Sequence, residues 1–234
     1  MSTFSIIIPV FNEARYIRQV IEAVDGVDVG PLSKEIIVVD DGSSDGTAEI
    51  LAGLRDDSQF AGELKVHICE RNAGKGAAVR AGLAMATGDI IAIQDADLEL
   101  DPGEFPSLLK PILEENVEAV YGSRFLRRSS AFSMNFLGNW FLTRLTNLLF
   151  RCHLTDMETA YKVIRGDVLR GLPLQANRFD IEPEITAWLC RKGVAIVEVP
   201  VSYNPRGATM GKKIRYTDGF AAVRCLIRCR FSSG

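Results

Sequence analysis

The chain has 234 residues, of which 47% are hydrophobic and 24% charged, and its formal net charge is −3 at pH 7. This composition is ordinary for a globular domain that buries a full core, and it excludes an intrinsically disordered chain. The slightly acidic balance argues against the broad basic field that drives nucleic-acid binding. We expect a single domain over residues 1–234.

The cysteines are odd in number and scattered, at Cys69, Cys152, Cys190, Cys225 and Cys229. This usage is typical of reduced thiols in a cytosolic protein, and a zinc site would need more ligands than Cys225 and Cys229. The N-terminus lacks the basic region of a signal peptide, and no apolar run reaches about 18 residues. We expect a cytoplasmic protein, with peripheral contact to the cytoplasmic membrane face as a further possibility.

Strand and helix patterns alternate through the first half of the chain. The strand patterns are at residues 4–10, 35–39, 65–69, 89–93 and 119–121. The helix patterns are at residues 13–24, 47–54, 77–86 and 106–115. This order predicts an α/β fold with a mostly parallel central sheet flanked by helices.

The second half is less regular. Residues 132–150 predict a helix with large apolar side chains on one side and polar ones such as Asn139 and Thr143 on the other. Helices at 181–192 and 217–231 flank a strand at 195–199. The amphipathic segments 132–150 and 220–231 suit either a membrane surface or packing in the core.

Each strand of the first half ends in a polar loop. These loops are Asn12-Glu13, Asp40-Asp41, residues 72–76 and residues 95–99. Because ligands bind beyond the carboxyl ends of parallel strands, we expect the four loops to line one crevice.

The acidic cluster at 95–99 predicts a metal site. Asp95 and Asp97 are one residue apart after a buried strand, so extended backbone points both carboxylates the same way. Such a pair suits Mg²⁺ or Mn²⁺ bound together with substrate phosphates, and Glu99 is a candidate third ligand. The metal would neutralise charge on a departing diphosphate, which makes Asp97 a candidate catalytic residue.

Two further loops carry candidate binding residues. Asp41 is expected to accept hydrogen bonds from a nucleobase or ribose. Gly74-Lys75-Gly76 lacks the third glycine of a dinucleotide fingerprint, which disfavours a dehydrogenase, and the chain has no Walker A loop. Lys75 at a helix entrance suits the positioning of a diphosphate instead.

The ordered segments PVFNE, DDGSSDGT, RNAGKGAAVRAG and DADLELDP resemble the inverting family 2 glycosyltransferases with the GT-A fold. YGSRF, TDMETAYKVIR and VPVSYNPR with GKKI narrow the resemblance to the dolichol- or polyprenyl-phosphate mannose or glucose synthase-like branch. The similarity runs from about Phe4 to Asp218. It implies a Rossmann-like, nucleotide-sugar-binding half at residues 1–122 and an acceptor half with amphipathic helices at 123–234.

The resemblance also implies roles for single residues. Positions matching the loops around the nucleotide sugar are Pro9, Phe11, Glu13, Val39, Asp41, Asp95 and Ala96. Asp95, Asp97 and Glu99 match the metal site. Arg124 matches a phosphate-facing arginine, and Arg206 with Lys212 or Lys213 matches a mobile basic loop that closes over the donor diphosphate.

The sequence leaves two classes of sugar acceptor open, a polyprenyl phosphate and a soluble hydroxyl compound. A polyprenyl phosphate is already anionic and needs no general base, whereas a soluble hydroxyl acceptor does. Asp156 is the candidate base, although Thr155-x-x-Glu158 also fits a helix capping box. The branch often has an arginine and a serine where this chain has Met134 and Gly138.

Those replacements would shift acceptor phosphate binding to Arg124, Arg127 and Arg128. We expect transfer of a hexose from a UDP- or GDP-sugar to a polyprenyl phosphate. The resemblance implies inversion at the anomeric carbon, and no second nucleophile is evident beside the metal pair. A soluble acceptor is the alternative, and an inactive scaffold subunit is disfavoured by the intact Asp41, Asp95 and Asp97.

Overall fold

The computed structural model describes residues 2–55, 60–127, 134–205 and 216–232. Its centre is a seven-stranded sheet with the order β3-β2-β1-β4-β6-β5-β7. The strands are β1 (Thr3–Val10), β2 (Ser33–Asp40), β3 (Glu63–Ile68), β4 (Ile90–Ile93), β5 (Ala119–Ser123), β6 (Lys162–Arg165) and β7 (Ile196–Pro200). Neighbours pair in parallel except β6, which is antiparallel to both β4 and β5.

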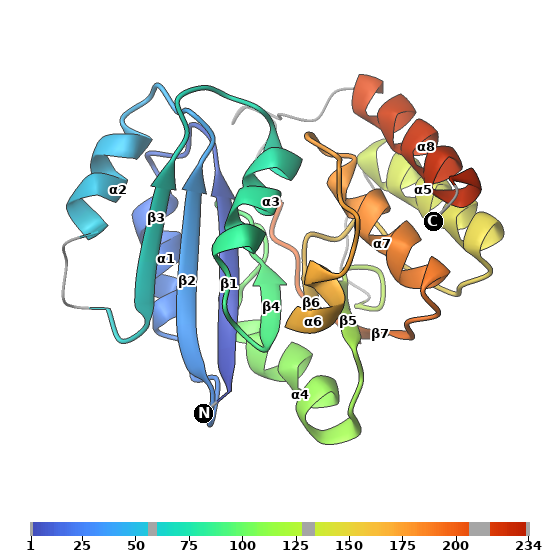
Figure 1. Ribbon diagram of the computed structural model, residues 1–234, viewed down its shortest axis with the longest axis horizontal. Helices are drawn as coiled ribbons and strands as arrows, with labels where there is room; N and C mark the ends of the chain where they lie inside the picture. Colours follow the sequence, from blue (N-terminus) through green and yellow to red (C-terminus); the bar gives the residue numbers. More distant parts are fainter. Residues whose placement is uncertain (1, 56–59, 128–133, 206–215, 233–234) are drawn as a thin grey trace.

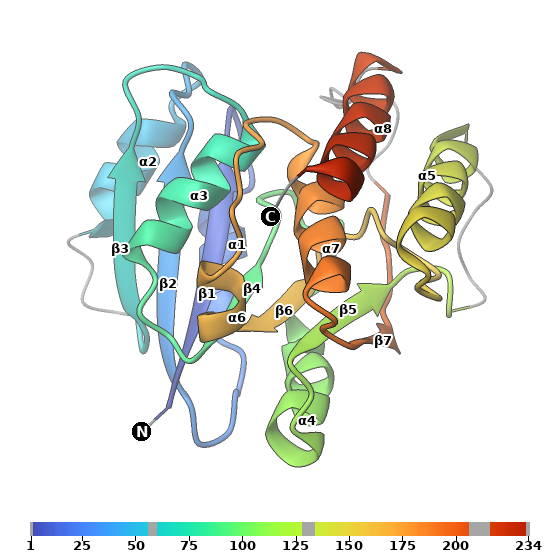
Figure 2. The same ribbon diagram turned by 45° about the vertical axis from the view of Figure 1, so that its right-hand side comes forward.

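Helices cover both faces of the sheet (Figures 1 and 2). The helices on one face are α1 (Ile17–Asp25), α2 (Thr47–Arg55) and α4 (Phe105–Glu115), which follows the short 3₁₀ helix η1 (Pro102–Glu104). Those on the other face are α3 (Lys75–Met85), α6 (Gly166–Arg170) and α7 (Ile181–Arg191). Helices α5 (Met134–Phe150) and α8 (Tyr216–Phe231) lie beside α7.

Alternation along β1 divides the core into two layers. Ile6 and Ile8 pack with the side chains of α1 and α4, whereas Ile7 packs with Val79 of α3. A Cβ atom on Gly82 of α3 would lie only 2.5 Å from Ile7 Cγ2. The sheet is therefore buried on both faces, as continuous apolar strands require.

The mostly parallel sheet and its flanking helices are confirmed, with two local differences. Helix α1 begins at Ile17 rather than residue 13, because the Glu13 carbonyl first accepts the N–H groups of Tyr16 and Ile17 in a turn. Strand β6 was not predicted. Its four residues are too few for an alternating pattern to be recognised, and its antiparallel pairing joins β4 to β5.

Helix α5 buries only part of its apolar surface. Thr143 and Thr146 are 3% and 0% exposed, whereas Phe141 and Leu148 are 54% and 78% exposed. On the neighbouring α8, Phe220 and Phe231 are also largely exposed. Both helices also reach the core, through Leu142 of α5 and Leu226 of α8, so core packing is confirmed for one side of each helix and the other side is exposed. No helix in the described ranges is long and apolar enough to cross a bilayer.

The close contact of α3 with β1 can be tested at Gly82. We expect Gly82→Ala to lower the free energy of unfolding by about 1–3 kcal/mol, because its methyl group must displace Ile7. Gly53→Ala on α2 is the control, since a Cβ there meets nothing within 4 Å. Alanine's higher helix propensity should make that variant as stable as the wild type or more so. Urea unfolding measures both, and equal effects would contradict the packing argument.

Candidate active site

The carboxyl ends of β1, β2 and β4 lie along one edge of the sheet because the three strands are parallel neighbours. The loops after β1 and β2 are bonded to each other. The Asn12 N–H donates to Ser43 Oγ at 2.8 Å, and the Ser44 N–H donates to Asn12 Oδ1 at 2.8 Å. Asn12 adopts φ 51°, which is one of the few left-handed positions that asparagine accepts readily. The loops after β1 and β2 therefore lie together, and the crevice predicted between all four loops stays a prediction.

The residues implied in nucleotide binding occupy this edge. Pro9 pairs with Val39 in the β1–β2 register, and both are buried. Phe11 is half-buried, and Glu13 is 8% exposed with its N–H donating to Thr47 Oγ1 at 3.0 Å. Their contact with a nucleotide stays a prediction.

Asp41 has a structural role that the sequence did not predict. Its two carboxylate oxygens accept the N–H groups of Ala73 at 2.8 Å and Gly74 at 2.7 Å, and the residue is only 3% exposed. Asp41 thus holds the loop that leads into α3, and this use competes with the predicted hydrogen bonds to a nucleobase or ribose.

The N-terminus of α3 does not offer its first N–H groups to a diphosphate. The N–H groups of Gly76 and Ala77 donate to the carbonyls of Arg178 and Asn177. A Cβ atom on Gly74 would lie 2.4 Å from the Asn177 carbonyl oxygen, so the segment before α7 packs directly on this glycine. Diphosphate binding by these amides is therefore disfavoured, and the Lys75 side chain extends toward the acidic loop.

Lys75 Nζ lies between two carboxylates. It is 2.6 Å from Asp95 Oδ1 and 2.6 Å from Glu182 Oε1 of α7. Burial by itself lowers the pKa of Lys75, but Asp95 and Glu182 outweigh burial and raise the pKa above its ordinary value. The lysine is therefore a fixed positive charge at the acidic loop.

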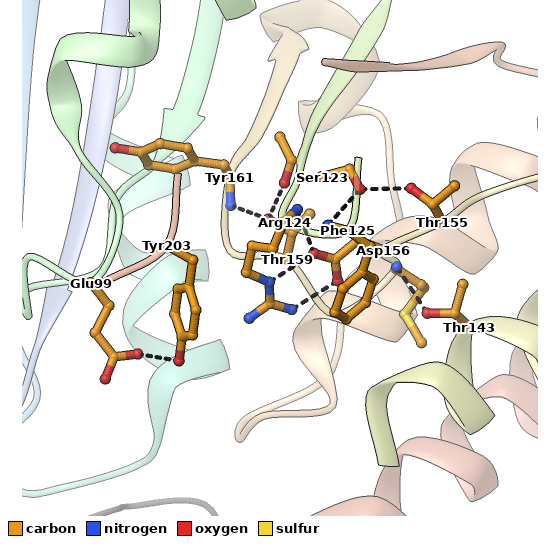
Figure 3. Close-up of polar contacts among 12 residues, drawn as sticks. Glu99, Ser123, Arg124, Phe125, Thr143, Thr155, Asp156, Thr159, Tyr161 and Tyr203 are labelled. Atoms are coloured by element: carbon orange, nitrogen blue, oxygen red, sulfur yellow. Dashed lines mark hydrogen bonds and ion pairs between the residues drawn. The ribbon is translucent and has the colours of Figure 1, made fainter. Parts of the chain in front are cut away.

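The three predicted metal ligands do not form one cluster. Asp97 Oδ1 accepts the Glu99 N–H at 3.1 Å, while Glu99 Oε2 accepts the Tyr203 hydroxyl at 2.8 Å (Figure 3). In the described part of the chain, ligand atoms within 4.8 Å of one another form a group of three only at Glu184, Cys225 and Cys229. A compact site of Asp95, Asp97 and Glu99 is therefore not preformed.

The residues nevertheless fit a divalent cation bound together with a substrate. Asp95 keeps 29% of its side chain exposed and already holds a cationic group, the Lys75 ammonium. Mg²⁺ and Mn²⁺ need only one or two carboxylates when substrate phosphates supply the other oxygens. Asp95 and Asp97 fit that requirement.

Arg124 and Asp156 form a buried bidentate ion pair (Figure 3). Arg124 Nε donates to Asp156 Oδ2 at 2.7 Å and Nη2 donates to Oδ1 at 2.8 Å, while the Arg124 backbone N–H also donates to Oδ2. Asp156 is 0% exposed. Burial opposes the charged form of Arg124, but Asp156 outweighs it and raises the pKa of the guanidinium.

The loop around Asp156 is not a helix start, so the capping-box interpretation of Thr155 and Glu158 is wrong. Instead, Glu198 of β7 accepts the N–H groups of Thr155 at 2.8 Å and Asp156 at 2.9 Å. Tyr203 lies against Arg124, with its ring centroid 5.4 Å from the guanidinium carbon.

A group of buried charges behind these pairs was missed by the sequence analysis. Burial, together with the Glu182 carboxylate, raises the pKa of Glu158 to about 8, although Lys162 and Arg124 oppose that shift. Burial lowers the pKa of Lys162 to about 8. Charged residues within otherwise apolar runs, as in YKVIR and IEPEI, are the signal that could have identified Lys162 and Glu182.

The predicted basic residues of the acceptor half are only partly described. Arg127 Nη1 is 2.9 Å from Glu104 Oε1 on the surface. Arg128, Arg206, Lys212 and Lys213 lie outside the described residues.

The protein has an α/β fold with a mostly parallel sheet, of the kind that binds ligands at the carboxyl ends of its strands. The acidic loop at this edge suits a complex of a metal ion and a diphosphate. The sequence profile described as Glycosyl transferase family 2 matches residues 5–172. The chain therefore belongs to this family and is a glycosyltransferase with the GT-A fold.

Among curated proteins, the chain is similar to a dodecaprenyl-phosphate galacturonate synthase of Rhizobium johnstonii, with 29% identity over 192 residues. That alignment covers 79% of this chain and 53% of the relative, so the chain spans about half of the relative's length. An uncharacterized protein of Methanocaldococcus jannaschii is 29% identical over 210 residues, covering 84% of this chain and 86% of that one.

Solved structures with the same fold include glucosyl-3-phosphoglycerate synthase of Mycobacterium tuberculosis. Its complex with uridine diphosphate has a TM-score of 0.74 at 22% identity, covering 100% of this chain and 82% of that one. Its complex with Mn²⁺, uridine diphosphate and phosphoglyceric acid has a TM-score of 0.72 at 21% identity, covering 100% and 80%. At these identities the likeness establishes the fold.

The buried charges predict a pH dependence of stability. Glu158 has a folded pKa of about 8, well above that of an exposed glutamate, so the folded state binds more protons than the unfolded state between about pH 5 and pH 8. Stability therefore falls as pH rises through this window. We expect Glu158→Gln to remove this contribution, so that the variant gains stability relative to the wild type from pH 5 to pH 8. Urea unfolding at several pH values measures the difference, and a constant difference would contradict the assignment.

Proposed function

We propose that the chain transfers a hexose from a UDP- or GDP-sugar to a polyprenyl phosphate, with inversion at the anomeric carbon. The observation that carries the choice of acceptor is the buried Arg124–Asp156 pair. Both Asp156 oxygens are engaged by Arg124, and the carboxylate has no exposed surface.

A general base must reach the proton that it removes, and Asp156 does not meet that requirement in this arrangement. An acceptor phosphate is already anionic, so its attack on the sugar needs positioning and charge stabilisation but no base. The geometry of Asp156 therefore favours a phosphate acceptor over a neutral hydroxyl.

The surface of α5 and α8 supports a lipid-linked acceptor. Phe141, Leu148, Phe220 and Phe231 are each more than half exposed on two helices that pack together. A polyprenyl chain or a membrane surface is the kind of environment that such apolar side chains bind. The similarity to a dodecaprenyl-phosphate galacturonate synthase points to the same acceptor class.

For the donor, we propose that Asp95 and Asp97 hold Mg²⁺ or Mn²⁺ together with the diphosphate. When bound, the cation neutralises charge on the departing nucleoside diphosphate. Pro9, Phe11, Glu13 and Val39 line the nucleotide, and Lys75 adds a fixed positive charge beside Asp95. We further propose that Arg206 and Lys213 close over the donor and exclude water.

A soluble acceptor is the second candidate. It is favoured by the solved structures with this fold, one of which contains phosphoglyceric acid beside Mn²⁺ and uridine diphosphate. Such an acceptor would need a base other than Asp156 in its present pairing. The assay below includes it as a competing substrate.

Transfer should depend on the metal and on Asp97. We expect the purified chain with Mn²⁺ or Mg²⁺ to transfer sugar to a short polyprenyl phosphate, and EDTA to abolish the reaction. Asp97→Asn should lower the rate at least about 100-fold because charge on the leaving group is no longer neutralised. Asp101→Asn is the matched control in the same loop, since asparagine keeps the cap that Asp101 provides to the Gly103 N–H.

The assay screens UDP- and GDP-sugars against polyprenyl phosphate and phosphoglyceric acid, with separation of the products. Product on phosphoglyceric acid alone would overturn the lipid acceptor while retaining the donor chemistry. No metal-dependent product with any donor would overturn the proposed function.

Asp156→Asn separates a structural role from that of a base. We expect a loss of about 3 kcal/mol in unfolding free energy, because Arg124 is left without its charge partner. At a temperature where the variant is folded, transfer to polyprenyl phosphate should fall less than about 10-fold. Loss of a general base would lower the rate about 10²–10⁴-fold instead, which would contradict the proposal.

A further inference from the structure

Lys75 has two acidic partners that come from different halves of the chain. Asp95 follows β4, and Glu182 lies in the first turn of α7. Both N···O distances are 2.6 Å, so the ammonium is shared rather than assigned to one carboxylate. The lysine side chain is 13% exposed.

Glu182 is positioned so that it can pair with Lys75 without the help of Asp95. The residue is 6% exposed, and its Oε2 atom is buried without a hydrogen-bond partner among the described residues. The neighbouring backbone is fixed, because Gly76 and Ala77 donate to the carbonyls just before α7. A short movement of the flexible lysine end can therefore exchange Asp95 Oδ1 for Glu182 Oε2.

Such an exchange matters when a divalent cation binds to Asp95. The cation and the ammonium would compete for the same carboxylate, and a buried ammonium left without a partner is strongly destabilised. Glu182 removes that penalty by keeping Lys75 paired. Without Glu182, each cation bound at Asp95 would leave the lysine uncompensated.

We propose that Glu182 is a positioning residue for the metal site: it receives Lys75 when a divalent cation takes Asp95. This inference rests on the proposed metal site at Asp95 and Asp97. Lys75 then occupies Asp95 in the empty site and is released to Glu182 in the loaded one, which leaves its ammonium beside the diphosphate.

The proposal predicts opposite effects on Mn²⁺ affinity for substitutions of Glu182 and of Lys75. Glu182→Gln should weaken Mn²⁺ binding about 10-fold or more, because Asp95 becomes the remaining carboxylate partner of Lys75. With the nucleoside diphosphate at saturation, Lys75→Met should leave Mn²⁺ binding equal or tighter, because the competing cation is gone. In the Lys75→Met background, Glu182→Gln should then change Mn²⁺ affinity less than about 2-fold, since the interaction between the two sites is removed.

The measurement is Mn²⁺ binding in the presence of uridine or guanosine diphosphate, followed by electron paramagnetic resonance of the free ion. No acceptor is added, so the readout is binding and not turnover. Glu35→Gln is the matched control: Glu35 is another buried carboxylate paired with a lysine, Lys65, and it accepts the Thr87 N–H away from the carboxyl edge of the sheet. Its substitution is expected to reduce stability and leave Mn²⁺ affinity within about 2-fold.

Folding does not obscure the result, because Lys75→Met with Glu182→Gln removes both charges together and leaves no unpaired ion between them. Equal effects of Glu182→Gln in the two backgrounds, or no effect in either, would overturn the inference and leave the proposed function intact. Absence of diphosphate-dependent Mn²⁺ binding by the wild type would overturn both.

Discussion

The Lys75 ammonium lies 2.6 Å from Asp95 and 2.6 Å from Glu182, and through it the two halves of the chain meet at the carboxyl edge of the sheet. A charge removed from water must be paired, and this requirement organises the whole edge. Asp41 accepts hydrogen bonds from the loop that leads into α3, and the N-terminus of α3 bonds to the segment before α7. Helix α7 then carries Glu182, which pairs with Lys75. The acidic loop after β4 is thereby placed against a buried cationic group.

The same requirement divides the acidic residues into two kinds. Asp41 and Asp156 are buried, and their oxygens are engaged by the protein itself. Asp95 remains partly exposed and is shared with a lysine that can leave. Residues of the first kind build the site, whereas residues of the second kind are suited to a ligand. The sequence does not distinguish the two kinds, because Asp41 and Asp95 both follow strands and Asp156 lies in a family motif.

The acceptor side follows from packing rather than from a motif. Helix α5 turns Thr143 and Thr146 inward, where Thr143 accepts the Met157 N–H at 3.1 Å and so supports the loop of Asp156. Inward-facing threonines leave Phe141 and Leu148 on the surface. One helix therefore supports the loop of the buried Arg124–Asp156 pair and also exposes apolar side chains.

The sequence by itself determined the α/β class, most element positions and the family, because apolar runs buried on both faces and ordered loop motifs are local signals. It also predicted Asp95, Asp97, Arg124 and Asp156 as site residues, and their roles stay predictions. Only the tertiary structure revealed the partners: Glu182 for Lys75, Arg124 for Asp156, Tyr203 for Glu99, and the antiparallel β6 that joins the two parts of the sheet. Pairing between residues far apart in the chain depends on how helices and strands pack, and no local pattern encodes it.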